Sequence, residues 1–437
     1  MKRETRNVKR ETIHTNRCVA GLGLLTTALS RITHHASRIT HHASRFTLTL
    51  WMAGLVMIVA GCRPTGPTPV EYTVPTAVRP TIAPVQPAVR DQPTPSPSPQ
   101  AQTLTPTAPA SSVPEPTSVK VVTHAGWNVF PLAPGGRVLT PTAGQDVVLW
   151  VAPAGPGLGL YLHNLATGET RQLAAPSNAG GCVCRGYRQG DWAAMVETES
   201  GASWWEVLAL NLSTGDTVSV GRTDDPATAS ALRPGEFAVN AGGLVVWKDV
   251  VTNADGSVVE TLRLHDAVTD DASVIISVRS PVRIDRVAMY GDWVVWGQAT
   301  EDEAGTRGDI FAYDVVSGRL FPIGETGRAW EPAIWGTTVV WKHADGPFAD
   351  GDVFLFDLET GQGQLLTEGG RVSAVGAGDG FVVWSSALDG IVNRHDLAAN
   401  TDEIIGRGTV GWLAAGANTV VWLLDGDPET LHVAWRR

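Results

Sequence analysis

A short apolar phrase recurs along the C-terminal three quarters of the chain. Two valines directly precede a tryptophan at Trp247, Trp296, Trp341, Trp384 and Trp422, the variant Val-Val-Leu-Trp ends at Trp150, and a degenerate copy ends at Met195. A repeat of roughly 40–50 residues is typical of stacked units that cannot bury their apolar faces alone. Runs rich in β-branched and aromatic residues also favour strands. The pattern therefore predicts repeated β-sheets.

Each repeat has four predicted strands, which the fourth unit shows most completely. Its apolar runs are Val294–Trp296, Asp309–Tyr313, Leu320–Ile323 and Trp330–Trp335. Between the second and third runs the chain must reverse, and residues 314–318 supply the polar and glycine residues of a tight turn. Four strands joined by short turns predict one antiparallel sheet per unit.

The reversing segment has the same chemistry in six units. The matching segments are Asn164–Gly168, Asn211–Gly215, Asp266–Asp270, Asp314–Gly318, Asp357–Gly361 and Asp396–Asn400. The first residue is always Asn or Asp, whose side chain can accept hydrogen bonds from the backbone ahead of it. The last is always Gly, Asp or Asn, which tolerate positive φ best. This is the chemistry of a hairpin built on a type I turn and a left-handed residue.

The two ends of the repeat region complement each other. The last unit stops after Leu431–Trp435 and lacks its third strand, whereas Trp127–Ala133 precedes the first complete unit. That early strand aligns with the third strand of the fourth unit at a constant offset of 191, which places Phe130 on Phe321. We therefore predict an all-β fold: a seven-bladed β-propeller over residues 120–437, with an N-terminal strand closing the last blade and leaving no free sheet edge.

Charge is segregated along the chain. Residues 1–62 hold nine Lys/Arg and two Asp/Glu, a net +7, and because the whole chain is −11, residues 63–437 carry −18. Phosphate binding requires a basic face, so this acidic region argues against a nucleic-acid partner. Surface carboxylates that keep the protein soluble explain the charge.

An export signal is predicted over residues 45–61. Arg45 precedes an uncharged apolar run, Phe46–Ala60, and small residues follow before Cys62. Fifteen residues rise only about 22 Å as a helix, less than the roughly 30 Å hydrocarbon core, so a cleaved signal is favoured over a permanent span. The sequence Val59–Cys62 resembles the lipobox of bacterial lipoproteins. The resemblance implies a diacylglycerol on the thiol of Cys62, anchoring an exported protein to the cell membrane; the alternative is an ordinary signal peptide.

The segments on either side of the signal carry no predicted fold. Residues 31–37 are repeated identically as residues 38–44, so residues 1–44 are interpreted as a dubious low-complexity extension, and no function is assigned to them. Residues 62–119 contain 15 of the 28 prolines. Such a segment cannot bury enough apolar area to fold and favours extended conformations. It is interpreted as a disordered Pro/Thr-rich tether.

The repeats resemble those of the TolB-type propeller family. The resemblance depends on Gly308–Gly318 and Gly351–Thr367 and covers about residues 120–437. It does not extend to the α/β domain that precedes the propeller in TolB. It implies an envelope-associated, protein-binding role, although the missing domain places membership of the Tol system in doubt. Propellers of outer-membrane assembly factors share the Asp-x-x-Thr-Gly turn but usually carry a Trp soon after it, which this chain lacks.

No catalytic motif is recognisable. The chain has no Gly-x-Ser-x-Gly elbow, no His-Glu-x-x-His, no phosphate loop and no dinucleotide fingerprint. The histidines are scattered, and His163, His265 and His395, each just before a predicted turn, are expected at the surface. We therefore expect no catalytic residues, metal or cofactor, and a protein- or glycan-binding platform rather than an enzyme. The alternatives are a channel-active lyase or glycosidase, which would need converging carboxylates, and a subunit of an envelope assembly complex.

Two cysteines stand out in the second unit. Cys182 and Cys184 would share one face of a strand with Cα atoms about 6.6 Å apart, which is near the upper limit for a disulfide. An exported protein meets oxidising conditions, so a local disulfide is expected. Free thiols, or a redox or metal role, remain the alternatives.

The candidate binding residues follow from the repeat spacing. Residues five or six positions before each repeat glycine should lie near the mouth of the central channel, and they are Arg185, Glu236, Arg286 and Glu331. Their alternating charge suits a polar peptide or polysaccharide. The alternative is that these side chains pair with one another between blades.

Overall fold

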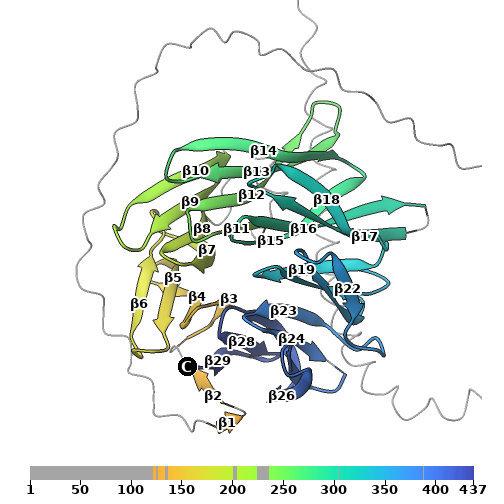
Figure 1. Cartoon of the computed structure of the whole chain (residues 1–437). Helices are drawn as coiled ribbons and strands as arrows, with labels where there is room; N and C mark the ends of the chain where they lie inside the picture. The colour runs from red at the N-terminus through yellow and green to blue at the C-terminus, as the bar shows by residue number, and fades with distance from the viewer. Residues whose placement is uncertain are drawn as a thin grey trace, which may run out of the picture. The chain divides into compact units, whose positions relative to one another are not determined.

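The computed structural model describes residues 122–124, 126–132, 136–199, 204–223, 236–303, 305–386 and 388–437. All regular elements in these ranges are β-strands (Figure 1). None of the described residues belongs to a helix long and apolar enough to cross a membrane. The predicted extension, signal and tether lie outside the described residues, as does Cys62.

The strands form antiparallel sheets. One sheet runs in the order β1 (Val122–His124), β2 (Trp127–Leu132), β29 (Asp427–Trp435), β28 (Thr419–Leu424) and β27 (Val410–Ala415). The largest runs β10 (Thr217–Thr223), β9 (Trp205–Asn211), β8 (Trp192–Glu199), β7 (Gly181–Gln189), β5 (Gly157–Asn164), β4 (Val147–Ala154) and β3 (Leu139–Gly144), and β6 (Thr170–Ala174) pairs with β5.

Four further sheets have four strands each, in sequence order. They are β11 (Phe237–Val239), β12 (Leu244–Thr252), β13 (Val258–Asp266) and β14 (Asp271–Arg279); β15 (Val282–Tyr290), β16 (Trp293–Asp302), β17 (Gly305–Asp314) and β18 (Arg319–Gly324); β19 (Ala329–Trp335), β20 (Thr338–His343), β21 (Asp352–Asp357) and β22 (Gln362–Leu365); and β23 (Ala374–Gly378), β24 (Phe381–Ser386), β25 (Ile391–Asp396) and β26 (Thr401–Arg407).

The first strands of successive units form an inner layer. Each contacts the next in the order β3, β7, β11, β15, β19, β23 and β27, and β27 contacts β3 in turn (Figure 1). We call these the inner strands. The largest sheet contains two of them, β3 and β7, because its halves are joined by a single parallel bridge between Leu158 and Cys182.

Chain segments from the two ends of the repeat region share one sheet. β2 pairs antiparallel with β29, and Phe130 lies opposite Val433 and Leu132 opposite Leu431. Leu132, Leu431 and Val433 are buried in one apolar cluster. The strand around Phe130 therefore covers the edge of β29 that would otherwise be unpaired.

The six predicted turns are confirmed. In each, the backbone N–H of the last residue donates to the carbonyl of the first, at 2.8 or 2.9 Å. The last residue has positive φ in all six, including the non-glycine residues Asp270 (63°) and Asn400 (52°). The first residue also caps the turn: Oδ1 of Asn164, for example, accepts from the backbone of Ala166 and Thr167.

The recurring tryptophans form the core. Trp150, Trp296, Trp341 and Trp422 are at most 2% exposed. Each stacks on the side chain directly opposite it on the next strand: Tyr161, Phe311, Phe354 and His432 respectively. On the other side, a glycine of the preceding sheet makes room for some of the tryptophans. A Cβ atom on Gly406 would lie 2.7 Å from Cζ2 of Trp422, and one on Gly324 would lie 3.1 Å from Cζ2 of Trp341.

The expected surface position of three histidines is wrong. His163, His265 and His395 are only 5–6% exposed. Each is paired with a residue of the following strand, and Nδ1 of His395 lies 2.8 Å from Oδ1 of Asp402. A residue just before a turn is still within the sheet, so its side chain contacts residues of the adjacent strand or of the turn, as His163 contacts Thr170 and His265 contacts Asp270.

Candidate functional site

The predicted mouth residues occupy one equivalent position of the inner strands. In five units this residue immediately precedes the one that pairs with the repeat tryptophan, or with Met195 in the second unit. In the first and fifth units it lies at the register shift opposite the repeat tryptophan. In chain order they are Thr140, Arg185, Glu236, Arg286, Glu331, Ala374 and Trp412. We call this set the mouth ring. The inner strands bring the four predicted residues onto one level of the fold.

Irregular backbone surrounds the mouth ring. The register of the inner strand against its neighbour shifts next to Arg185, Arg286 and Glu331. Thr140 and Glu331 have positive φ, at 42° and 56°. A β-bulge bends the strand and redirects a side chain. The bulges therefore separate the mouth ring from the regular, apolar part of each inner strand.

Arg286 and Glu331 form an ion pair between neighbouring sheets. Nη1 of Arg286 lies 3.5 Å from Oε2 of Glu331, and Nζ of Lys342 lies 3.2 Å from Oε1 of the same carboxylate. The alternative from the sequence, pairing between blades, is therefore realised for these two residues. Both side chains remain about one quarter to one third exposed, so they are accessible to a ligand.

Arg185 lies against two aromatic rings. Its guanidinium carbon is 5.1 Å from the ring centroids of both Tyr187 and Trp412. The indole N–H of Trp412 donates to the carbonyl of Pro141 at 2.7 Å, which fixes that ring. Burial lowers the pKa of Arg185, with a further lowering by Arg286 and an opposing effect of Glu236. Arg185 thus interacts electrostatically with Glu236 and Arg286, the next two members of the mouth ring.

Glu236 is a partly buried carboxyl paired with a lysine. Its Oε2 lies 3.1 Å from Nζ of Lys248, which also approaches Glu260 at 3.7 Å. Burial raises the pKa of Glu236, Lys248 opposes this shift, and Asp285 and Glu260 add to it. A carboxyl with a raised pKa can hold a proton closer to neutral pH, which is what a general acid requires.

A disulfide adjoins the mouth ring. The structure joins Cys182 to Cys184, with Cα atoms 5.0 Å apart. This is shorter than the distance expected for a flat strand, because the register shifts between Val183 and Arg185. The carbonyl of Cys184 accepts a hydrogen bond from Oγ1 of Thr140 at 3.0 Å. The disulfide is therefore connected to the neighbouring inner strand one residue before Arg185.

A small cavity lies between the inner strands. It has a volume of about 120 Å³ and is lined by residues from every inner strand. Among the four predicted residues only Arg286 lines it. The rest of its wall is mostly small or apolar, as at Ala143, Ala288 and Ala333. Arg185, Glu236 and Glu331 lie outside this lining.

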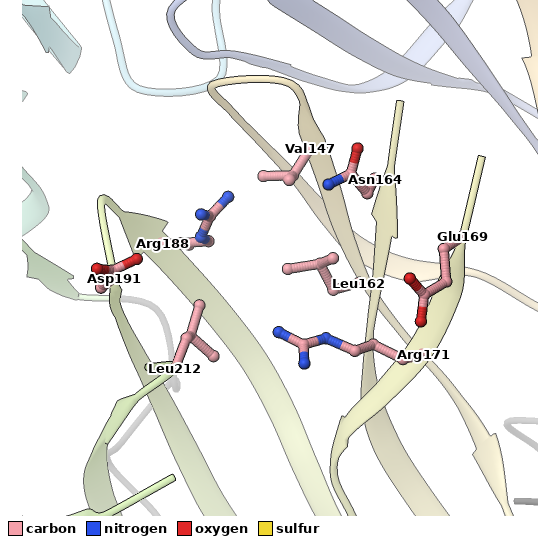
Figure 2. Close-up of a pocket in the computed structure, with 8 residues that line it drawn as sticks. All are labelled: Val147, Leu162, Asn164, Glu169, Arg171, Arg188, Asp191 and Leu212. Carbon is pink, nitrogen blue, oxygen red and sulfur yellow. The ribbon is translucent and has the colours of Figure 1, made fainter. Parts of the chain in front are cut away.

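Sequence reasoning missed one charged residue of the inner strands. Arg188 lines both the central cavity and a second cavity between β5 and β7 (Figure 2). The sequence did contain a signal for Arg188, because the residues at the equivalent position of the other six repeats are apolar. Within the described ranges no group of three or more His, Cys, Asp or Glu side chains is placed to hold a metal ion.

No protein-family model matches the chain, and no curated protein sequence matches it significantly. Solved structures do resemble it. An acylaminoacyl peptidase from Pyrococcus horikoshii matches with a TM-score of 0.51 at 11% identity, over 68% of this chain and 50% of that one. The β-propeller domain of the trilobed protease from Pyrococcus furiosus matches with a TM-score of 0.50 at 13% identity, over 69% and 94%. An oligogalacturonate lyase from Vibrio parahaemolyticus matches at 0.49 and 11% identity, over 73% and 96%.

These likenesses establish the class of fold, an all-β propeller, and at such identities they establish the fold alone. The chain spans half the length of the acylaminoacyl peptidase. They also correct our expectation that the chain is not an enzyme. That expectation depended on missing motifs, yet the solved structures that share the fold include a peptidase and the propeller domain of a protease. Catalytic groups brought together from separate blades leave no local motif, so the sequence did not exclude activity.

Proposed function

We propose that residues 120–437 form a seven-bladed propeller closed by β2. The cyclic contacts of β3, β7, β11, β15, β19, β23 and β27 support this count, since each begins one unit of four strands. The single bridge between β5 and β7 supports dividing the largest sheet into two blades. The pairing of β2 with β29 supports the closure. The blades are exported and anchored to the membrane through Cys62, as the signal and tether in the sequence indicate.

The mouth ring is the proposed ligand site, and its ligand is a polar glycan. The observation that carries this proposal is the equivalent placement of four charged side chains, Arg185, Glu236, Arg286 and Glu331, of which Arg286 pairs with Glu331 and acts electrostatically on Arg185 together with Glu236. Their alternating charge offers donors and acceptors to hydroxyl and carboxyl groups. Trp412 and Tyr187 add flat apolar faces beside Arg185. A few convergent polar groups next to aromatic surface are typical of small-molecule sites.

A channel-active carbohydrate enzyme is the second candidate, and one observation favours it. Glu236 has a raised pKa and lies beside Lys248, so it is the group of the mouth ring best suited to donate a proton. A glycosidase or lyase would use it as the general acid. Binding at the mouth ring is the shared first step of both candidates.

Charge reversal tests the site. The purified full-length chain is screened against immobilised oligosaccharides, with Arg286→Glu and Glu331→Arg as test variants. Arg283→Glu is the matched control, because Arg283 lies on the same strand and forms an exposed ion pair with Glu301. We expect either test variant to weaken glycan capture at least tenfold while circular dichroism stays unchanged. Equal capture by all variants, or capture of peptides alone, would contradict the proposal.

A further inference from the structure

One inner-strand position differs in charge from all its equivalents. In each unit, one residue of the inner strand lies opposite the second residue of the strand that follows it. These residues are Ala143, Arg188, Val239, Met289, Ile334, Ala377 and Ala415. Six of these seven residues are apolar, as expected where adjacent sheets pack together. In β7 a guanidinium takes that place, so the contact between the β3–β6 and β7–β10 strands contains a polar gap.

The gap is a cavity of about 280 Å³. Its apolar wall consists of Val147, Leu162 and Leu212, and its other lining residues are all polar or charged (Figure 2). Arg171 of β6 and Arg188 of β7 extend into it from two strands of the largest sheet that do not pair with each other, and both guanidinium groups face the same space (Figure 2). The volume is slightly below the 300–1,000 Å³ usual for drug-sized ligands, so it suits a smaller molecule.

Arg188 is partly buried, and Arg171 lies near enough to act on it electrostatically. Burial lowers the pKa of Arg188, Asp191 opposes this shift, and Arg171 adds to it. The buried Nε of Arg188 has no hydrogen-bond partner in the described part of the chain. Buried donors are normally satisfied. An anionic group between the arginines would relieve their repulsion and accept this hydrogen bond.

Asn164 adds a third donor. Its Oδ1 accepts from the backbone N–H groups of Ala166 and Thr167 at 2.9 and 3.0 Å, and this fixes the orientation of the amide. The NH₂ end is thereby directed towards the cavity (Figure 2). Glu169 and Asp191 place carboxylates at opposite sides of the same cavity (Figure 2). The site therefore offers donors at its centre, acceptors at its sides and an apolar wall.

We propose that this cavity binds a free α-amino acid with an apolar side chain. The ligand carboxylate accepts from Arg188 and Asn164, its ammonium group contacts one of the flanking carboxylates, and its side chain packs against Leu212, the partly exposed member of the apolar lining. A simple anion would use the arginines but would leave the acceptors and the apolar wall without a partner. This site is distinct from the mouth ring and does not depend on the glycan proposal.

Three related compounds test the ligand chemistry. Isothermal titration of the full-length chain compares L-leucine with N-acetyl-L-leucine, which lacks the ammonium group, and with L-leucinamide, which lacks the carboxylate. We expect L-leucine to bind at least tenfold more tightly than either derivative. No binding of L-leucine at millimolar concentration would overturn the proposal, as would equal binding of N-acetyl-L-leucine.

Two variants test the location. Arg188→Met removes the central donor, and Asn164→Asp replaces a donor with a carboxylate. The second variant preserves the turn, because Asp266, Asp314, Asp357 and Asp396 occupy the same position in other units. We expect each to weaken L-leucine binding at least tenfold. The control is Arg371→Met, since Arg371 is exposed and paired with Asp389. If Asn164→Asp binds L-leucine as tightly as the unaltered chain, the cavity is not the site.

Discussion

Asn418 hydrogen-bonds Asp146 across a sequence separation of 272 residues. Its Nδ2 donates to Oδ1 of Asp146 at 2.6 Å, and its Oδ1 accepts the backbone N–H of Asp146 at 3.0 Å. The same carboxylate oxygen accepts from the indole N–H of Trp435 at 2.9 Å, and Asn418 also donates to the carbonyl of Arg436 at 2.8 Å. The last sheet is thus tied both to the first repeat and to the C-terminal residues.

Removing this amide should weaken the whole domain. Asn418→Ala leaves several partly buried polar groups without partners, and each such loss costs about 1–3 kcal/mol. We expect the free energy of unfolding, measured with urea, to fall by at least about 1 kcal/mol. Asp292→Ala is the matched control, because Asp292 occupies the equivalent turn and is exposed. Equal stability of the two variants would show that the contact contributes nothing.

The glycine beside Trp422 should not tolerate a larger side chain. A Cβ atom at Gly406 would lie 2.7 and 3.0 Å from Cζ2 and Cε2 of Trp422, and the ring is 1% exposed and cannot move away. Overpacking of this kind typically costs about 1–3 kcal/mol. We expect Gly406→Ala to lower the thermal midpoint of unfolding.

The control for this effect is Gly346→Ala, where an added Cβ has no atom within 4 Å. Gly346→Ala should leave the thermal midpoint unchanged. In a Trp422→Leu background, where the large ring is absent, Gly406→Ala should lower the thermal midpoint by less than it does in the unaltered chain. A Gly406→Ala protein as stable as the Gly346→Ala protein would mean that the close packing between neighbouring sheets is not required.

Stability should decrease as the pH falls below about 6.5. Burial lowers the pKa values of His163 and His432 from 6.5, and it lowers that of His343 with help from Arg328. Below pH 6.5 the unfolded chain therefore binds more protons than the folded one, so acid favours unfolding. Glu236 has the opposite sign, because its raised pKa favours protonation in the folded state.

Urea unfolding at pH 7.5 and 5.5 measures this dependence. His163→Gln removes one of the three groups, so we expect the loss of stability between these two pH values to be smaller in the variant. The control is Arg371→Met, which changes no histidine. It should lose as much stability between pH 7.5 and 5.5 as the unaltered chain does. A larger loss in His163→Gln would reverse the assigned sign.

The sequence predicted the local structure well because the signals were local. The Asn or Asp at the start of each turn, as in Asp314, and the residue with positive φ at its end, as in Asn400, act within five residues. Repeat spacing also placed Arg185, Glu236, Arg286 and Glu331 at equivalent positions, whereas their location at the mouth of a channel stays a prediction.

Other features depended on contacts that no single repeat contains. The role of Arg188 appears only when β7 is packed against the preceding strands, and the burial of His395 depends on the adjacent strand and sheet. The absence of a catalytic motif was a poor guide for the same reason, because a propeller assembles its central groups from several blades. Comparing equivalent positions between repeats would have identified Arg188 from the sequence.

The central claim is that β2 completes the last blade, and a cysteine crosslink tests it most directly. Pro131 lies opposite His432, and both are partly exposed. After oxidation of the double variant Pro131→Cys with His432→Cys, peptide mass spectrometry should find a bond between these two positions. The control is the double variant Pro131→Cys with Thr430→Cys, because Thr430 lies two residues from His432 along the same strand. It should give much less of the crosslinked product. Equal crosslinking of the two pairs, or none in the first, would contradict the closure.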